Sequence, residues 1–465
     1  MPPPEQAMKL DLCKDFAPFY AHATGKAVSD ANEQAGIVWE SGSPTGGVKL
    51  STLKKDMGST MIVKKRCMAA SMLLGALLLT GSVQVPEAHA RGSASEFATQ
   101  LSADDRRQFE EYYKAWTFHQ AEKDAFWDQV ESKRSARRKK IRRGDLVRKS
   151  DYVTGYPPEF EGPNLSKRLA AAWAKFLAGD EKKPERPRDE LPGINDYLAA
   201  AKRHYGFVPE RISEREFKLR YAREALRLGL SKDQVVRVYA LETGGIGTAD
   251  MQAGIHPLRK TGRPISSALG YAQLLSANSV DELVKHGADF VARLERMSRS
   301  HEVSAERRQN LQKKASILRR MLKKAKSIPH VWSRHQAFAK TGHGMGIHPI
   351  NLDGDIGPWL QVIKLKGIKE FAERKNRYNL DPTELELMNL AGPGTGVEMM
   401  TSVGLRMPTV NFFSRRGYER NSIVRGRTSA ELLKALEDRM NHNVKNSGAV
   451  EFAEVFDMLT AEARR

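Results

Sequence analysis

Residues 238–245 read VYALETGG, an apolar segment that runs into a glutamate and stops at two glycines. The apolar spacing before Glu242, with Ser231 as an N-cap, predicts a helix that ends at Gly244-Gly245. A carboxyl group at that end is half-buried, and burial raises the pKa of a carboxyl group. Glu242 is therefore a candidate general acid, although a glutamate before Gly-Gly is most often only a helix end.

Helical periodicity continues on both sides of this segment, and the alternation typical of strands is nearly absent. Ser213 and Glu216 resemble a capping box that opens a helix through Leu228. Further helices are predicted at 359–375 and 428–443, with a basic helical hairpin at 280–326. One small β-hairpin is expected near 250–273. The fold class is therefore mainly α.

The chain is strongly basic. Its 465 residues carry a formal net charge of +20, which favours a polyanionic partner such as nucleic acid, an anionic membrane or an acidic cell-wall polymer. Basic side chains gather at 133–143 and again at 307–324. Either run would grip an anionic polymer or form the solvated face of a helix.

Residues 61–90 have the three parts of a secretory signal. A basic start at Lys64–Arg66 precedes an apolar run at Met68–Leu79, and Ala88-His89-Ala90 forms a small-residue cleavage site before Arg91. The apolar run is shorter than the roughly 20 residues that a membrane span needs. Cys13 and Cys67 both precede the cut, so the mature chain would contain no cysteine.

These features predict five segments. They are an extension ahead of the true start, or a disordered segment (1–60), the signal peptide (61–90), a basic helical N-terminal region with a linker (91–193), a helical catalytic domain with its basic insertion at 280–326 (194–427), and C-terminal helices (428–465).

Two later segments strengthen the case for Glu242. Residues 266–274 read SSALGYAQL and residues 387–396 read LMNLAGPGTG. With ETGG, they resemble the three ordered motifs of the lytic transglycosylase family of the lysozyme-like superfamily, over roughly 205–415. That family shows Glu-Ser at a helix end, then Gly-Leu-Met-Gln, then Ala-Tyr-Asn-x-Gly. Here Leu387-Met388 replaces the Ala-Tyr, and one extra residue separates Asn389 from its glycine.

The resemblance implies a lysozyme-like helical catalytic domain and a mechanism. Glu242 would protonate the oxygen between N-acetylmuramic acid and N-acetylglucosamine, then act as base on the sugar's own 6-hydroxyl, which gives a 1,6-anhydro product. The two glycines would let the glycan approach the backbone. The remaining motif residues would bind substrate: Gly270, Tyr271, Gln273, Asn389 and Gly392. Tyr271 would offer a stacking face or pack in the core.

Other functions stay open. A two-carboxylate muramidase needs a second acid, for which Asp250 is nearest in sequence and Asp353 and Asp355 are others. A non-catalytic peptidoglycan-binding or scaffold protein could keep the same fold. His343 and His348 show no third metal ligand at a matched spacing, so we expect neither a metal nor a cofactor. The expected partner is peptidoglycan glycan strands, with no nucleic acid and no stable membrane span after signal cleavage.

The signal predicts export to the periplasm with cleavage between Ala90 and Arg91. Cell fractionation followed by N-terminal sequencing should find a soluble periplasmic protein that begins at Arg91. A stable cytoplasmic pool of full-length protein, or an exported chain that begins near Met1, would contradict the assignment.

Overall fold

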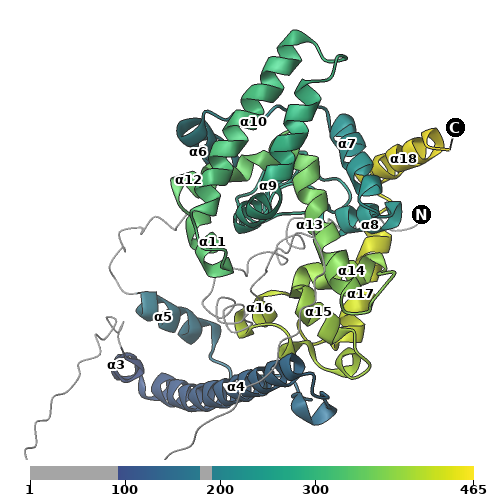
Figure 1. Ribbon diagram of the computed structural model, residues 1–465. Coiled ribbons are helices and arrows are strands. Elements are labelled where there is room, and N and C mark those ends of the chain that lie inside the picture. Colours follow the sequence, from purple (N-terminus) through teal and green to yellow (C-terminus); the bar gives the residue numbers. More distant parts are fainter. Residues whose placement is uncertain (1–92, 179–190, 465) are drawn as a thin grey trace, which may run out of the picture. The chain divides into compact units, whose positions relative to one another are not determined.

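The structure is a computed structural model that describes residues 93–178 and 191–464 (Figure 1). The predicted extension, the signal peptide and residues 179–190 of the linker lie outside these residues. The described chain is almost entirely helical, and its β-structure is limited to isolated bridges. The mainly α class predicted from the sequence is confirmed.

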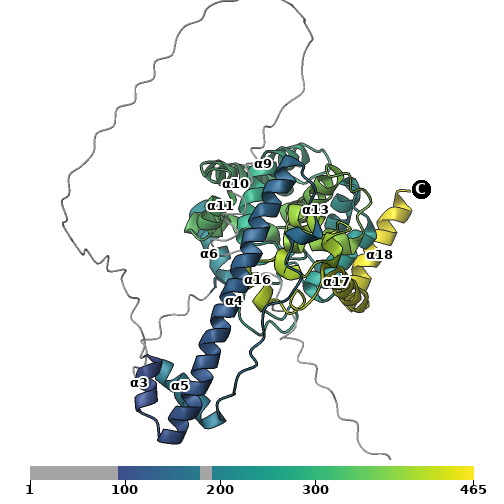
Figure 2. The ribbon, with the colours of Figure 1, turned by 90° about the horizontal axis from the view of Figure 1, so that it is seen from below.

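The chain divides into two compact units. Among described residues, the smaller contains 93–113 and 164–178, and the larger contains 114–163 and 191–464. The smaller unit holds α3 (Ala94–Thr99), α5 (Lys167–Ala178) and the start of α4 (Ala103–Arg143) around an aromatic core. The backbone N–H of Asp105 donates to the Ser102 hydroxyl at the start of α4, which then continues without a break through the basic run (Figure 2).

The larger unit holds the remaining helices, and a long loop at 244–275 follows the helix that contains Glu242. They are α6 (Ile194–Tyr205), α7 (Glu214–Arg227), α8 (Lys232–Thr243), α9 (Ser276–Ser298), α10 (Ala305–Lys326), α11 (Trp332–Ala339), α12 (Gly342–Ile347), α13 (Ile356–Glu373), α14 (Pro382–Ala391), α15 (Pro393–Met399), α16 (Arg415–Arg420), α17 (Ser429–Asn443) and α18 (Ser447–Glu462).

Helix α8 begins and ends where its sequence predicts. Ser231 accepts a hydrogen bond from the backbone of Gln234, whose side chain accepts one in return from the Ser231 backbone. Gly244 ends the helix at φ 66°, in the left-handed region that glycine adopts without a steric penalty. The predicted apolar face of α8 is buried. Glu242 therefore lies in the last turn of a helix with buried sides.

Helix α13 contributes to two hydrophobic cores in the larger unit. The N-terminal part of α13, including Ile356 and Leu360, packs into a core formed mainly by α9 and α10. Those two helices form the hairpin predicted at 280–326 (Figure 1). The later part of α13, including Val362 and Leu365, packs into the core around α8. One helix thereby fixes the basic hairpin against the scaffold of Glu242.

The predicted β-hairpin region near 250–273 is a loop with bridges in place of regular strands. Antiparallel bridges join Gln252 to Leu269 and Ile255 to Gly262. Backbone hydrogen bonds such as Ala253 N–H to the Ala268 carbonyl (3.1 Å) hold the turn together. Gly254 and Gly262 both have positive φ, and each stands too close to opposing backbone for a side chain.

The C-terminal helices belong to the same core as α8. Side chains of α17 and α18, including Leu432, Leu436 and Phe452, lie in the hydrophobic cluster that contains α8. The segment 428–465 is thus part of the structure that supports Glu242.

The basic run of α4 is partly used inside the protein. Arg134 donates hydrogen bonds to the carbonyls of Val410, Asn411 and Phe413 at 2.6–3.1 Å. Arg137 is 1% exposed and pairs with Glu398 at 2.9 Å. These two arginines hold α4 against residues 410–413 and Glu398, so they are not free to bind an external polyanion.

No helix in residues 93–178 or 191–464 has the length and apolarity that crossing a membrane would require.

The packing of Gly245 predicts a large cost for any side chain there. Its φ is 70°, and an added Cβ would lie 2.2 Å from the carbonyl oxygen of Asn443. Gly206 is a matched control, because its φ is 66° and nothing lies within 4 Å of the added atom. Gly206→Ala should cost about 1–2 kcal/mol for the left-handed backbone. Gly245→Ala should cost a further 1–3 kcal/mol, roughly, for overpacking.

Urea unfolding of both variants measures the difference. Equal destabilisation by the two substitutions would show that α17 does not press against the end of α8.

Candidate active site

The carboxyl group of Glu242 is held at the end of α8 beside α14. Glu242 is 7% exposed. The side-chain amide of Asn389, on α14, donates a hydrogen bond to Glu242 Oε1 at 2.9 Å. The first and third of the three sequence motifs therefore meet, although 147 residues separate them along the chain.

A second carboxyl group completes this site. Asn389 Nδ2 also lies 3.2 Å from Glu386 Oε2 and 3.3 Å from Oε1, one turn earlier on α14. Glu386 is fully buried. Burial raises the pKa of Glu386 well above its usual range, and the charge of Glu242 and a hydrogen bond to Glu242 raise it further. Burial and repulsion therefore favour the form of the pair in which one carboxyl group stays protonated.

Lys364 supplies positive charge beside the two glutamates. This half-buried lysine on α13 interacts electrostatically with Glu242 and Glu386, and also with Glu282. Burial lowers the pKa of the Lys364 ammonium group, while those carboxylates oppose the decrease. The lysine favours the ionised form of each glutamate, whereas burial and mutual repulsion favour the protonated form. Burial and repulsion outweigh the lysine at Glu386.

The turn at Gly392 lies on the solvent side of the site. Gly392 ends α14 at φ 86°, and Pro393 begins α15 directly afterwards. Nothing lies within 4 Å of a Cβ added at Gly392. The residues from Asn389 to Gly392 are all partly exposed.

The second motif is enclosed by the protein. Tyr271 is 1% exposed, and its ring contacts the rings of Tyr239 and Phe452. Its hydroxyl donates a hydrogen bond to Glu214 at 2.6 Å. The sequence left two roles open for Tyr271, and the structure shows core packing. A buried ring offers no face on which a sugar could stack. Tyr271 does lie against α8, through Tyr239.

Gly270 and Gln273 shape the long loop. Gln273 is buried, and its amide donates to the carbonyl of Gly270 at 2.7 Å. Gly270 has φ 77°, and an added Cβ would meet the side chain of Gln361 at 2.5 Å. Both residues make these contacts within the protein, where they set the path of the loop that follows α8.

The two glycines after Glu242 are also occupied by the protein's own chain. The side chain of Asn446 donates to the Gly244 carbonyl at 2.7 Å, and the Ala449 N–H donates to the Gly245 carbonyl at 3.0 Å. The expectation that these glycines leave room for a glycan is wrong, because the C-terminal helices cover them.

The three aspartates considered as a second catalytic acid pair with basic side chains elsewhere in the protein. Asp250 pairs with Arg211 at 2.9 Å and with Lys260 at 2.8 Å. Burial works to raise the pKa of Asp250, but hydrogen bonds from Lys260 and Thr248 outweigh it and hold the pKa at about 2. Asp250 is therefore a poor proton donor at neutral pH.

Asp353 and Asp355 belong to a buried ion-pair cluster. Lys314, on α10 and 4% exposed, lies 3.0 Å from Asp353 and 2.5 Å from Asp355. Arg307 and Arg220 pair with Asp355 as well. These carboxylates neutralise part of the basic hairpin and fix α10 to α13.

His343 and His348 do not converge on a shared site. His348 is buried between Ser279 (2.8 Å) and the Ser267 carbonyl (2.7 Å), and burial lowers its pKa to about 4. The ring of His343 lies 4.5 Å from that of His204.

Glu386 is the site residue that the motif search missed. It lies three residues before Asn389, so the two share a helix face. A usable signal was present, because Glu386 is flanked by Leu385, Leu387 and Met388. A charged residue within an apolar helical run is rarely buried without a partner.

Comparisons of the chain with protein-family models, with curated proteins and with solved structures found no match. The candidate site rests on the residues and geometry described above.

Proposed function

We propose that the protein is a peptidoglycan lytic transglycosylase that cleaves the bond between N-acetylmuramic acid and N-acetylglucosamine. Glu242 acts as the acid and then as the base, and the product carries a 1,6-anhydro ring. The observation that carries the proposal is the buried pair of Glu242 and Glu386, bridged by Asn389.

The pair meets the first chemical requirement of the reaction. Cleavage needs a carboxylic acid that is still protonated near neutral pH, so that it can protonate the departing sugar oxygen. The raised pKa of Glu386 keeps one proton within the pair. Glu242 is the more exposed of the two, at 7% against 0%, so it is the member that would deliver the proton.

The closeness of the two carboxyl groups favours the single-acid route. Glycosidases that use two carboxylates place them about 5 Å or more apart, on opposite sides of the scissile bond. Glu242 and Glu386 share a hydrogen bond and the same amide nitrogen. No sugar fits between groups in such contact, so they act together as one acid/base. The sugar's own 6-hydroxyl is then the nucleophile.

A non-catalytic wall-binding protein is the second candidate, and the basic composition is what favours it. A binding protein has no use for two mutually repelling carboxyl groups in its interior, because burying ionisable groups costs free energy. The pair is therefore better explained by catalysis. Export to the periplasm through the signal at 61–90 is part of the same proposal.

Glu242→Gln should lower peptidoglycan cleavage by roughly 10²–10⁴-fold, because glutamine keeps the shape of the side chain but donates no acidic proton. Asp250→Asn is the control and should cost little, since its charge is already neutralised by Arg211 and Lys260. Digestion of purified sacculi followed by mass spectrometry of the muropeptides measures rate and product together. An active Glu242→Gln protein would rule out the site.

Glu386→Gln should have a different signature. Glutamine can still donate an N–H to Glu242 but cannot hold the shared proton, and it removes the repulsion between the carboxyl groups. Activity should fall less than in Glu242→Gln, the products should remain 1,6-anhydro sugars, and the alkaline limb of the kcat/KM profile should move to lower pH.

The same variant has a stability readout. Because the pKa of Glu386 is raised in the folded protein, its contribution to stability is present at low pH and lost as pH rises through that pKa. Glu386→Gln should therefore lose less stability than wild type as the pH rises from the ordinary pKa range of a glutamate through the raised pKa of Glu386. A two-carboxylate hydrolase would behave differently in the activity assay. It would give products with reducing ends, and Glu386→Gln would be as inactive as Glu242→Gln.

A further inference from the structure

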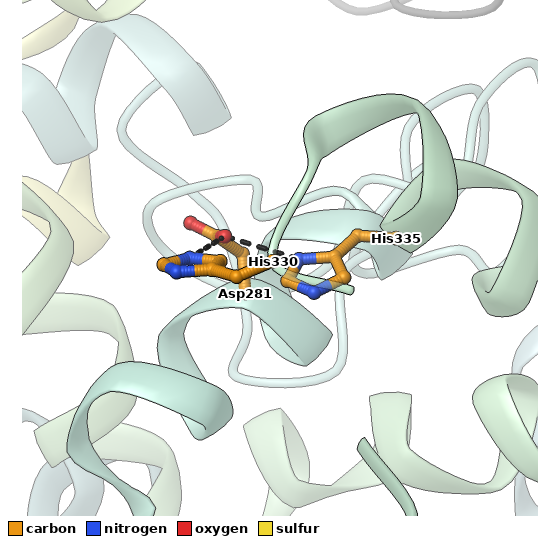
Figure 3. Close-up of side chains that lie close together, drawn as sticks. All are labelled: Asp281, His330 and His335. Atoms are coloured by element: carbon orange, nitrogen blue, oxygen red, sulfur yellow. Dashed lines mark hydrogen bonds and ion pairs between the residues drawn. The ribbon is translucent and has the colours of Figure 1, made fainter. Parts of the chain in front are cut away.

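Three side chains from separate parts of the chain meet at one end of α11. Asp281 lies in the second turn of α9, His330 in the segment between α10 and α11, and His335 on α11. Figure 3 shows both imidazole rings directed at the same carboxyl group. His330 Nε2 and His335 Nδ1 each lie 3.1 Å from Asp281 Oδ1.

The spacing of these donor atoms suits a small divalent cation. One ligand atom from each of the three residues lies within 4.8 Å of the other two. Tetrahedral zinc with bonds of about 2.0–2.1 Å separates its ligand atoms by roughly 3.3 Å. The observed 3.1 Å separations are close to that value, so a cation could enter with small side-chain movements.

The type of ligand agrees with the geometry. Two imidazole nitrogens and one carboxylate oxygen form a set that zinc binds well, and three protein ligands leave a fourth position for water. The side chain of His330 is 40% exposed, so a cation can reach the cluster from solvent. His335 is fully buried and Asp281 is 14% exposed, so the inner side of the site is enclosed.

A fourth residue orients the carboxylate. Lys285, one turn after Asp281 on α9, pairs with Asp281 Oδ2 at 2.5 Å and leaves Oδ1 to face the histidines. Carboxylates that bind metals are commonly held in this way by an outer partner.

His335 is costly as a packing residue. It is 0% exposed, and its Nε2 has no hydrogen-bond partner within residues 93–178 and 191–464. Its Nδ1 contact is with Asp281. Burying a polar ring costs free energy unless it is bonded, and the one nitrogen of His335 that is bonded faces the cluster.

We propose that Asp281, His330 and His335 bind one zinc ion, which ties α9 to α11 and to the segment that follows α10. Binding replaces the protons on the two facing nitrogens, and each imidazole stays neutral by carrying its proton on the other nitrogen. The ion strengthens the end of the basic hairpin. This site is separate from the proposed glycosidic chemistry and does not depend on it.

The test uses the full chain after chelator treatment and dialysis. Isothermal titration calorimetry with zinc should show one bound ion per chain. A thermal melt of the zinc-bound protein should give a higher melting temperature than the metal-free protein. Cobalt(II) should give the visible absorption of a tetrahedral N/O site. His330→Ala should weaken binding by roughly tenfold or more and abolish the cobalt spectrum. His330 is exposed, so the substitution should leave the fold intact, as circular dichroism will show.

His301→Ala is the matched control, because His301 is an exposed histidine in the turn between α9 and α10. It should bind zinc like wild type. A wild-type protein that takes up no zinc, or equal binding by wild type and His330→Ala, would overturn the proposal, the second result marking the zinc as adventitious.

Discussion

The candidate site depends on how α8 ends. Gly244 and Gly245 both take a left-handed backbone, which ends the helix at Thr243, one residue after Glu242. The carbonyl groups left unpaired at a helix end need partners. Here α17 and α18 supply them: Asn443 donates to the Ala240 carbonyl at 3.0 Å, and Asn446 and the backbone of Ala449 bond the two glycine carbonyls. The C-terminal helices thereby fix the position of Glu242, although they carry none of its chemistry.

Buried charge is accommodated in this protein in two ways. In the Lys314 cluster, carboxylates and basic side chains pair with one another at 2.5–3.0 Å. In the Glu242–Glu386 pair, two acidic groups meet beside one lysine, and burial and repulsion favour the protonated form of Glu386. The first arrangement stabilises the contact of α10 with α13 and is chemically inert. The second leaves a transferable proton at a partly open helix end, which is why function is better sought there.

Helix α13 links these features. It packs into both hydrophobic cores of the larger unit, and it carries Lys364 between them. Lys364 interacts with Glu282 as well as with the glutamate pair, and Glu282 is the neighbour of Asp281 in the histidine cluster. A series of buried and half-buried charges thus runs from the proposed active site towards the proposed zinc site. Among the described residues, Arg134, Arg137, Lys218 and Lys314 are buried in such internal contacts, so net charge alone overstates the basic surface that is available to a polyanion.

The sequence by itself determined the helices and their ends. The caps at Ser102, Ser213 and Ser231, the stop at Gly244 and the hairpin at 280–326 follow from local spacing and capping chemistry, which act within a few residues. It also singled out Glu242 by its place at a helix end, and Asn389 through the resemblance of its motif to that of the lytic transglycosylase family. Only the tertiary structure decided that Glu386 partners Glu242, that Tyr271 and Gln273 are enclosed, that α17 covers Gly245, and that Asp281 meets two histidines 49 and 54 residues later. Such contacts join segments far apart in the chain, and burial and proton sharing arise only once those segments have packed together.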